Sequence, residues 1–227
     1  MSILSIQNYL AEHFQDCLEA VSEIAKSDGD QPSPIQSAQL MYSFDKINKR
    51  IYPESACFCS ADALFVRKNC IELIEFKTGF KRRITKQNWK PEKAGCDHLQ
   101  GGICEDYWKL FWKLEDCEKG ALIDSIKDKA VESYVTLEKH ILPQQKGSSP
   151  IQLRYIAVID SESMEDYEDA LSGLSNMKTN PTNSIGQVKN ALSKLCRCKD
   201  CEGSPYYYDD IVVCSFQYFQ SLLSQYS

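Results

Sequence analysis

The sequence lacks several features that mark large classes of proteins. No stretch of about 18 consecutive apolar residues occurs, so we expect no membrane-spanning helix and no membrane partner. The apolar start of the chain is interrupted by Glu12, Asp16 and Glu19, which the apolar run of a signal peptide would not carry. A Walker A loop, a G-x-S-x-G elbow and an H-E-x-x-H motif are missing, which argues against the enzyme classes that depend on them.

An excess of basic residues is also missing. The 227 residues include 26 lysines and arginines against 32 acidic residues, which gives a formal net charge of −6. Nucleic-acid-binding proteins usually carry a basic surface, so a surface of that kind would have to be local here. The content of 43% hydrophobic and 26% charged residues is typical of a globular chain. The length fits one α/β domain with additions.

The chain contains eleven cysteines, an odd number that rules out complete intramolecular pairing. Without a secretory signal, this content indicates reduced thiols and a cytoplasmic location. The densest cluster is Cys196, Cys198 and Cys201, which could begin a zinc site with Cys214 or a distant cysteine as the fourth ligand. The spacing is not a pair of C-x2-C motifs, so ordinary reduced cysteines are the simpler interpretation. A weaker group of ligand-type residues is Cys96, His98 and Cys104.

The apolar pattern predicts two helices in the first part of the chain. Apolar residues recur at steps of three and four from Ile3 to Ile24, which is typical of an amphipathic helix. A second stripe with this spacing runs from Leu40 to Ile51. We expect residues 1–26 to form a helix packed on or appended to a single domain of residues 36–227.

A hairpin follows, and then helices alternate with strands. Two apolar segments, 63–66 and 70–77, flank the polar turn residues Arg67-Lys68-Asn69 and predict the hairpin. Gly120 is expected to separate an aromatic helix around Tyr107–Trp112 from the next helix. The later expected elements are a helix over 122–141, a buried strand over 151–159, a helix over 185–195, a strand over 211–215 and a C-terminal helix. This order predicts an α/β fold with a mixed sheet.

The hairpin brings two acidic residues toward each other. A two- or four-residue loop would place Leu64 opposite Leu73 and Asp62 opposite Glu75, whereas a three-residue loop would shift this register. Directly opposed side chains have Cβ atoms about 4.5–5.5 Å apart, so the two carboxylates would repel each other without a cation. Mg²⁺ binds through one or two carboxylates plus substrate phosphate. Lys77 stands on the same face and could steady a water or hydroxide nucleophile, or stabilise charge that develops on a phosphate.

These residues resemble the motif of a known superfamily. Asp62, a short strand and turn, and then Glu75-Phe76-Lys77 are similar to the PD-(D/E)xK, or restriction-endonuclease-like, nucleases. The proline of the motif's name is absent, because Ser60-Ala61 precede Asp62. The strong part of the resemblance covers residues 40 to 80. It implies a restriction-endonuclease-like αβββαβ core with a mixed central sheet flanked by helices, and here extra N-terminal and C-terminal helices.

The resemblance also implies an activity and a set of site residues. Such enzymes hydrolyse phosphodiester bonds with Mg²⁺ or Mn²⁺, and we expect DNA rather than RNA as the substrate. Asp62, Glu75 and Lys77 would be catalytic, and Asp62, Glu75 and the backbone carbonyl of Phe76 would bind the metal ion. A helix before the first strand often supplies another acid, for which Asp45 is the candidate and Glu54 the next. The helix after the E-x-K strand often adds a polar or basic group, for which Lys127 is the candidate and Lys129 or Asp124 the alternatives.

Basic residues gather next to the proposed site. From Arg67 to Lys93 there are nine basic and three acidic residues, a local balance of +6 in a chain of −6. This segment is a candidate phosphate-contacting surface, and Trp89 within it could stack on a base. A solvated basic loop is the alternative. The residues expected to contact nucleic acid are Lys81, Arg82, Arg83 and Lys86.

Two competing hypotheses belong to other functional classes. The acidic net charge favours a catalytically inactive nuclease-fold module that binds or regulates a partner. The cysteine cluster at 196–201 allows a zinc-dependent interaction module. A homodimer or a protein partner is compatible with each of these interpretations.

Overall fold

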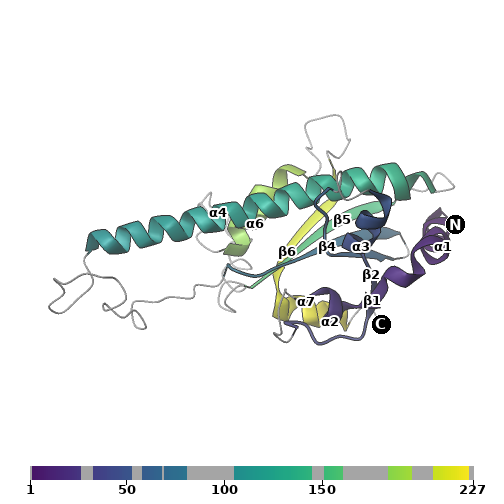
Figure 1. Cartoon of the computed structure of the whole chain (residues 1–227), viewed down its shortest axis with the longest axis horizontal. Coiled ribbons are helices and arrows are strands. Elements are labelled where there is room, and N and C mark those ends of the chain that lie inside the picture. The colour runs from purple at the N-terminus through teal and green to yellow at the C-terminus, as the bar shows by residue number, and fades with distance from the viewer. Residues whose placement is uncertain are drawn as a thin grey trace.

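A computed structural model describes residues 2–26, 33–52, 58–67, 69–80, 105–144, 151–160, 184–195 and 207–224. Its centre is a six-stranded sheet in which the strands lie in chain order (Figure 1). The strands are β1 (Leu18–Ala20), β2 (Leu40–Ser43), β3 (Ala63–Val66), β4 (Cys70–Lys77), β5 (Gln152–Ile159) and β6 (Asp210–Ser215). Neighbours from β1 to β4 pair antiparallel, and β4, β5 and β6 pair parallel. The expected α/β fold with a mixed sheet flanked by helices is confirmed.

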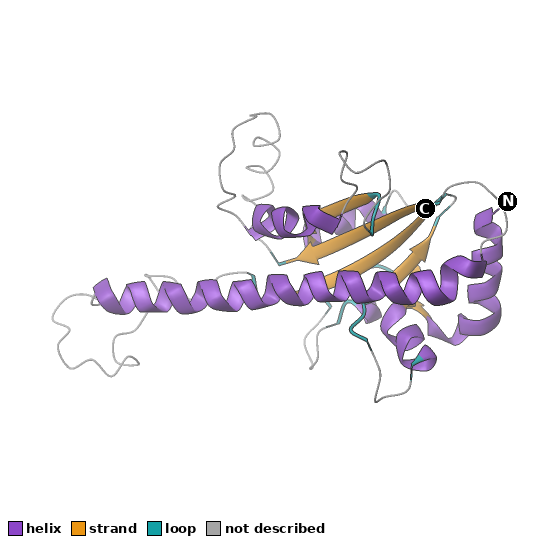
Figure 2. Cartoon of the chain, turned by 90° about the horizontal axis from the view of Figure 1, so that it is seen from above, coloured by secondary structure: helices purple, strands orange, loops and turns teal. Residues whose placement is uncertain are grey.

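Helices cover both faces of the sheet. They are α1 (Ser2–Phe14), α2 (Val21–Ile24), α3 (Phe44–Ile51), α4 (Glu105–Thr136), α6 (Ser184–Leu192) and α7 (Phe216–Leu223). One buried apolar cluster joins α1, α3, α4 and α6 to one face, and a second joins α2 and α7 to the other. Figure 2 shows that the first part of α4 extends beyond the end of the sheet. None of the helices in the described ranges combines the length and apolar character needed to span a membrane.

The hairpin has the predicted register. Val66 pairs with Ile71 and Leu64 with Leu73 in the ladder between β3 and β4. Alternation along β4 then puts Ile71, Leu73 and Glu75 on the face covered by α4. The prediction succeeded because the apolar residues of both strands must face the same core, and a one-residue slip would turn them outward.

Three predictions about helix boundaries were wrong. The N-terminal helix ends at Phe14, because Leu18–Ala20 instead pairs with β2 as an edge strand. Leu40–Ser43 is the strand that accepts this pairing, so only Phe44–Ile51 of the predicted 40–51 helix is helical. Gly120 does not separate two helices, since α4 runs through it. Glycine inside a helix costs only about 1 kcal/mol relative to alanine, which a long helix tolerates.

Candidate functional site

Asp62 lies immediately before β3, in a segment that hydrogen bonds hold against α4. The Ala61 N–H donates to the buried Ser133 hydroxyl at 2.7 Å, and the Cys59 N–H donates to the Glu132 carboxylate. The Asp62 N–H donates to the carbonyl of Ile74 at 3.0 Å, and the Phe76 N–H donates to Asp62 Oδ2 at 2.7 Å. These bonds fix the Asp62 carboxylate beside the end of β4.

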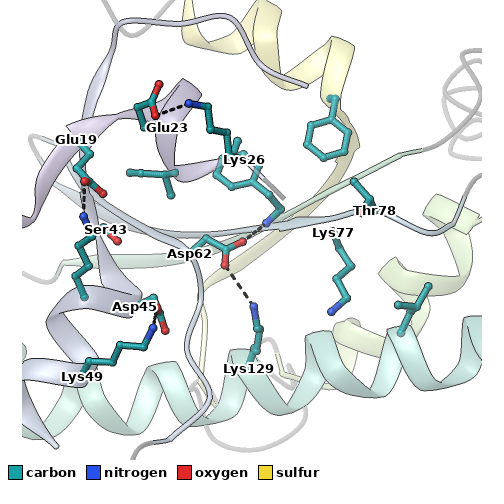
Figure 3. A pocket seen from close by; sticks show the side chains of 16 residues that line it. Glu19, Glu23, Lys26, Ser43, Asp45, Lys49, Asp62, Lys77, Thr78 and Lys129 are labelled. Carbon is teal, nitrogen blue, oxygen red and sulfur yellow. Dashed lines mark hydrogen bonds and ion pairs between the residues drawn. The ribbon is translucent and has the colours of Figure 1, made fainter. Parts of the chain in front are cut away.

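Glu75 and Asp62 converge on one cation, the ammonium of Lys129 in α4. Lys129 Nζ lies 2.9 Å from both Oε atoms of Glu75 and 3.3 Å from Asp62 Oδ1. The Glu75 side chain is fully buried, whereas the side chains of Asp62 and Lys129 are 24% and 23% exposed. Figure 3 shows Lys129 reaching up from α4 to Asp62. The expected approach of the two carboxylates is therefore present, and a positive charge lies between them.

Burial and mutual repulsion shift the protonation of this group. Burial, and then the charge of Asp62, raise the pKa of Glu75 to about 8. Burial also raises the pKa of Asp62. Burial alone would lower the pKa of Lys129, but the charges of Glu75 and Asp62 outweigh it and raise that pKa above its usual value. The pair of carboxylates thus favours a bound proton or a bound cation.

The Lys77 side chain contacts α4 rather than the two carboxylates. Its Nζ lies 3.2 Å from the Ser125 hydroxyl of α4, and no bond joins it to Asp62 or Glu75 in the described part of the chain. It lines a pocket of about 870 Å³ together with Asp62, Phe76 and Lys129 (Figure 3). Lys77 therefore presents its charge to the same pocket as Asp62, whereas the fully buried Glu75 lies behind the pocket wall.

The other lysines around this pocket are paired with carboxylates. Lys26 lies 2.6 Å from Glu23, Lys49 lies 2.5 Å from Asp45, and Lys46 contacts Glu19. Within the described ranges, Lys77 is the pocket lysine with no carboxylate in salt-bridge distance. An ammonium of this kind is suited to an incoming anion.

The end of β4 is fixed by Asp160, which follows β5. Its carboxylate accepts the N–H of Gly79 at 3.0 Å and that of Phe80 at 2.8 Å. Gly79 has a φ of +109°, which L side chains rarely adopt, and a Cβ there would lie 3.2 Å from Leu122. This turn holds the chain directly after Lys77 and Thr78 at the rim of the pocket.

The two secondary candidates have different positions. Asp45 lies on α3 and lines the pocket, where its carboxylate accepts hydrogen bonds from Lys49 and, at 3.2 Å, from the Ser60 hydroxyl. Lys127 is not at the carboxylates: it lies 3.1 Å from the exposed Asp124. The helix after β4 does bring a lysine to the site, but that lysine is Lys129.

The helical spacing within α4 contains a signal that points to Lys129. Ile126, Ala130 and Ser133 are buried and recur at helical spacing on the face of α4 that packs on the sheet. Lys129 is three positions after Ile126 and four before Ser133, so it shares this face. Lys127 is turned about 100° away from Ile126, as one residue along an α-helix of 3.6 residues per turn must be.

Several predicted residues lie outside the described ranges. Among them are the expected nucleic-acid contacts Lys81, Arg82, Arg83 and Lys86, the alternative acid Glu54 and the cysteine cluster Cys196, Cys198 and Cys201. Cys96, His98 and Cys104 lie outside them as well. Cys214 is a buried cysteine in β6.

The ligands that the described residues offer to a metal ion at this site are carboxylate oxygen atoms. They contain no group of three or more His, Cys, Asp or Glu side chains that could hold a metal ion. Mg²⁺, however, needs only one or two carboxylates when substrate phosphate and water complete its shell. The oxygen atoms of Asp62 and Glu75 fit that requirement, and the Lys129 ammonium stands where such a cation would be attracted.

Comparisons with known proteins give no further guide to this site. Models of protein families, curated proteins and solved structures were each searched, and none matches the chain. A functional assignment therefore depends on the geometry and chemistry of the residues described above.

Proposed function

We propose that the protein is a metal-dependent nuclease that hydrolyses phosphodiester bonds, with DNA as the expected substrate. The observation that carries this proposal is the convergence of the Asp62 and Glu75 carboxylates on a single cation at 2.9–3.3 Å. Two such carboxylates, with a lysine facing the same pocket, are the groups that this hydrolysis needs.

The strand order supports the resemblance to the PD-(D/E)xK nucleases. Strands β2, β3 and β4 pair antiparallel, α4 crosses over, and β5 then pairs parallel to β4. Apart from α3, which stands between β2 and β3, this succession agrees with the strands and second helix of the αβββαβ core that the resemblance implies. Asp62 and Glu75 then occupy the two positions at which that motif has its acids.

Each side chain has a distinct chemical task in this proposal. Asp62 and Glu75 would hold Mg²⁺ or Mn²⁺, with the Phe76 carbonyl as the further ligand that the resemblance implies. The ion, when bound, supplies a polarised phosphate and a water of lowered pKa. The Lys77 ammonium, oriented by Ser125, binds the phosphate and stabilises the negative charge that develops on it. Asp45 stays at the pocket rim, where Lys49 and Ser60 hold its carboxylate.

One observation favours the second candidate, a catalytically inactive module that binds or regulates a partner. The Lys129 ammonium already forms ion pairs with both carboxylates. A site that needs no metal ion would keep these ion pairs of Lys129 with Asp62 and Glu75 permanently. The inactive module predicts no metal binding and no cleavage by any variant.

Cleavage assays distinguish the two candidates. Single- and double-stranded DNA and RNA are incubated with Mg²⁺ or Mn²⁺ and with wild type, Lys77→Ala or Lys127→Ala. Removing one group that stabilises transition-state charge typically costs about 10²–10³ in rate, so we expect a loss of that order for Lys77→Ala. Lys127→Ala is the matched control, because this lysine pairs with Asp124 outside the site. Equal rates for Lys77→Ala and wild type would contradict the proposal.

A further inference from the structure

The position of Lys129 has a consequence for metal binding. Its ammonium makes three contacts of 2.9–3.3 Å with the carboxylates assigned to the metal ion. An ion coordinated by Asp62 and Glu75 would share the same oxygen atoms with this ammonium. Two positive charges within a few ångströms in a partly buried pocket repel each other strongly. Lys129 and a divalent ion are therefore alternatives at this position.

The surroundings of Lys129 leave room for its side chain to be displaced from the carboxylates. It lies on the buried face of α4, but its side chain is 23% exposed at the pocket wall, so it has an open side to move into. Glu132 stands three positions later on α4, a spacing at which side chains of a helix are neighbours. The Glu132 carboxylate accepts the Cys59 N–H and offers a negative charge to a displaced ammonium.

We propose that Lys129 is a built-in competitor of the metal ion, which binds Asp62 and Glu75 only when it displaces the lysine. This inference rests on the proposed metal-dependent function and adds a form of regulation to it. In the absence of the ion, the lysine offsets part of the negative charge of the two carboxylates and keeps them in place. The measured affinity for the ion is then set by how much more strongly the carboxylates bind the ion than the Lys129 ammonium. Lys129 therefore raises the metal concentration that is needed to fill the site.

Calorimetric titration with Mn²⁺ tests this competition. It compares wild type with Lys129→Met, and Lys127→Met serves as the control on the same helix. A hydrogen bond to a charged group corresponds to a factor of about 10–100 in an equilibrium constant, so Lys129→Met should bind Mn²⁺ at least about tenfold more tightly. Lys127→Met should bind like wild type. An unchanged or weaker affinity of Lys129→Met would overturn the inference.

Two further measurements test the competition if Lys129→Met does not fold. Lys129→Gln retains a hydrogen-bond donor for the carboxylates without the charge, and the same gain in affinity is expected. In wild type, reductive methylation of Lys129, read by peptide mass spectrometry, should become several-fold faster in Mg²⁺ than in chelator, while Lys127 stays constant. A Lys129 rate that does not rise with Mg²⁺ would contradict displacement.

The outcomes separate this inference from the function on which it rests. Wild type that binds Mn²⁺ and cleaves, with no gain in Lys129→Met, would overturn competition and leave the nuclease intact. Absence of both Mn²⁺ binding and cleavage in every variant would overturn both. Binding that appears only in Lys129→Met or Lys129→Gln would support the competition directly.

Discussion

The ammonium of Lys129 in α4 lies 2.9 Å from both carboxylate oxygens of Glu75 in β4, although 54 positions separate the two residues. Glu75 is fully buried, and a buried carboxylate without a partner loses its hydration with nothing in return. Lys129 also contacts Asp62. This group of one lysine and two acidic residues therefore governs the stability, the pH response and the cation binding of the site.

The protonation of Glu75 should make folding stability depend on pH. Its pKa in the folded protein is about 8 against 4.5 for an ordinary glutamate, so the folded state holds a proton that the unfolded state releases between these values. Stability should therefore fall as pH rises through this window, by at most about 1.4 kcal/mol per pH unit. Urea unfolding of wild type and Glu75→Gln at pH 6, 7 and 8 measures this effect. The variant should lack this part of the slope, and identical slopes would contradict the assigned cause.

Loss of the Ser133 hydroxyl should loosen the segment that carries Asp62. Ser133→Ala removes the acceptor of the buried Ala61 N–H, and an unsatisfied buried group costs about 1–3 kcal/mol. Urea unfolding should show a loss of that size, and cleavage should fall because Asp62 is no longer held. Ser193→Ala is the control, since its hydroxyl is exposed and donates to the nearby Asn190 carbonyl. A Ser133→Ala variant as stable and as active as Ser193→Ala would refute this role.

A side chain at position 79 should strain the end of β4. Gly79→Ala forces a residue with a Cβ to adopt a φ of +109° and to approach Leu122 at 3.2 Å. Backbone strain of this type costs about 1–3 kcal/mol, and a thermal or urea unfolding experiment should show it. Gly120→Ala is the matched control, because among the described residues a Cβ at that position would meet nothing within 4 Å apart from its chain neighbours and the local helix backbone, and alanine favours the helix. Gly120→Ala should be neutral or stabilising, and the opposite ranking of the two variants would contradict this account.

The carboxylate hairpin could be predicted from the sequence, whereas its cation, Lys129, was predicted only as an alternative to Lys127. The approach of Asp62 to Glu75 follows from local information, because a short loop and two apolar strands determine one register. Lys129 reaches the site through the packing of a long helix whose position no local pattern specifies. The burial of Ile126 and Ala130 shows which face of α4 meets the sheet, and only this orientation distinguishes Lys129 from Lys127.

The wrong helix predictions near the N-terminus have a related cause. Phe14, Leu18 and Val21 have helical spacing, yet residues 18–20 pair with Leu40–Tyr42 as a strand. A short apolar segment satisfies either period, and the choice depends on a partner strand about 20 positions away. The edge of the sheet next to the pocket, which carries Glu19, was therefore not predicted.

The central claim is that Glu75 belongs to a metal-dependent catalytic centre, and a second buried glutamate on the same strand gives the sharpest control. Glu72 is also fully buried in β4, but it faces the other side of the sheet and pairs with Arg154 at 3.0 Å. The decisive measurement is the rate of Mg²⁺- or Mn²⁺-dependent DNA cleavage by wild type, Glu75→Gln and Glu72→Gln at equal concentrations of folded protein. We predict that Glu75→Gln abolishes cleavage while Glu72→Gln retains it. Equal cleavage by Glu75→Gln and wild type, or no cleavage by wild type, would contradict the claim.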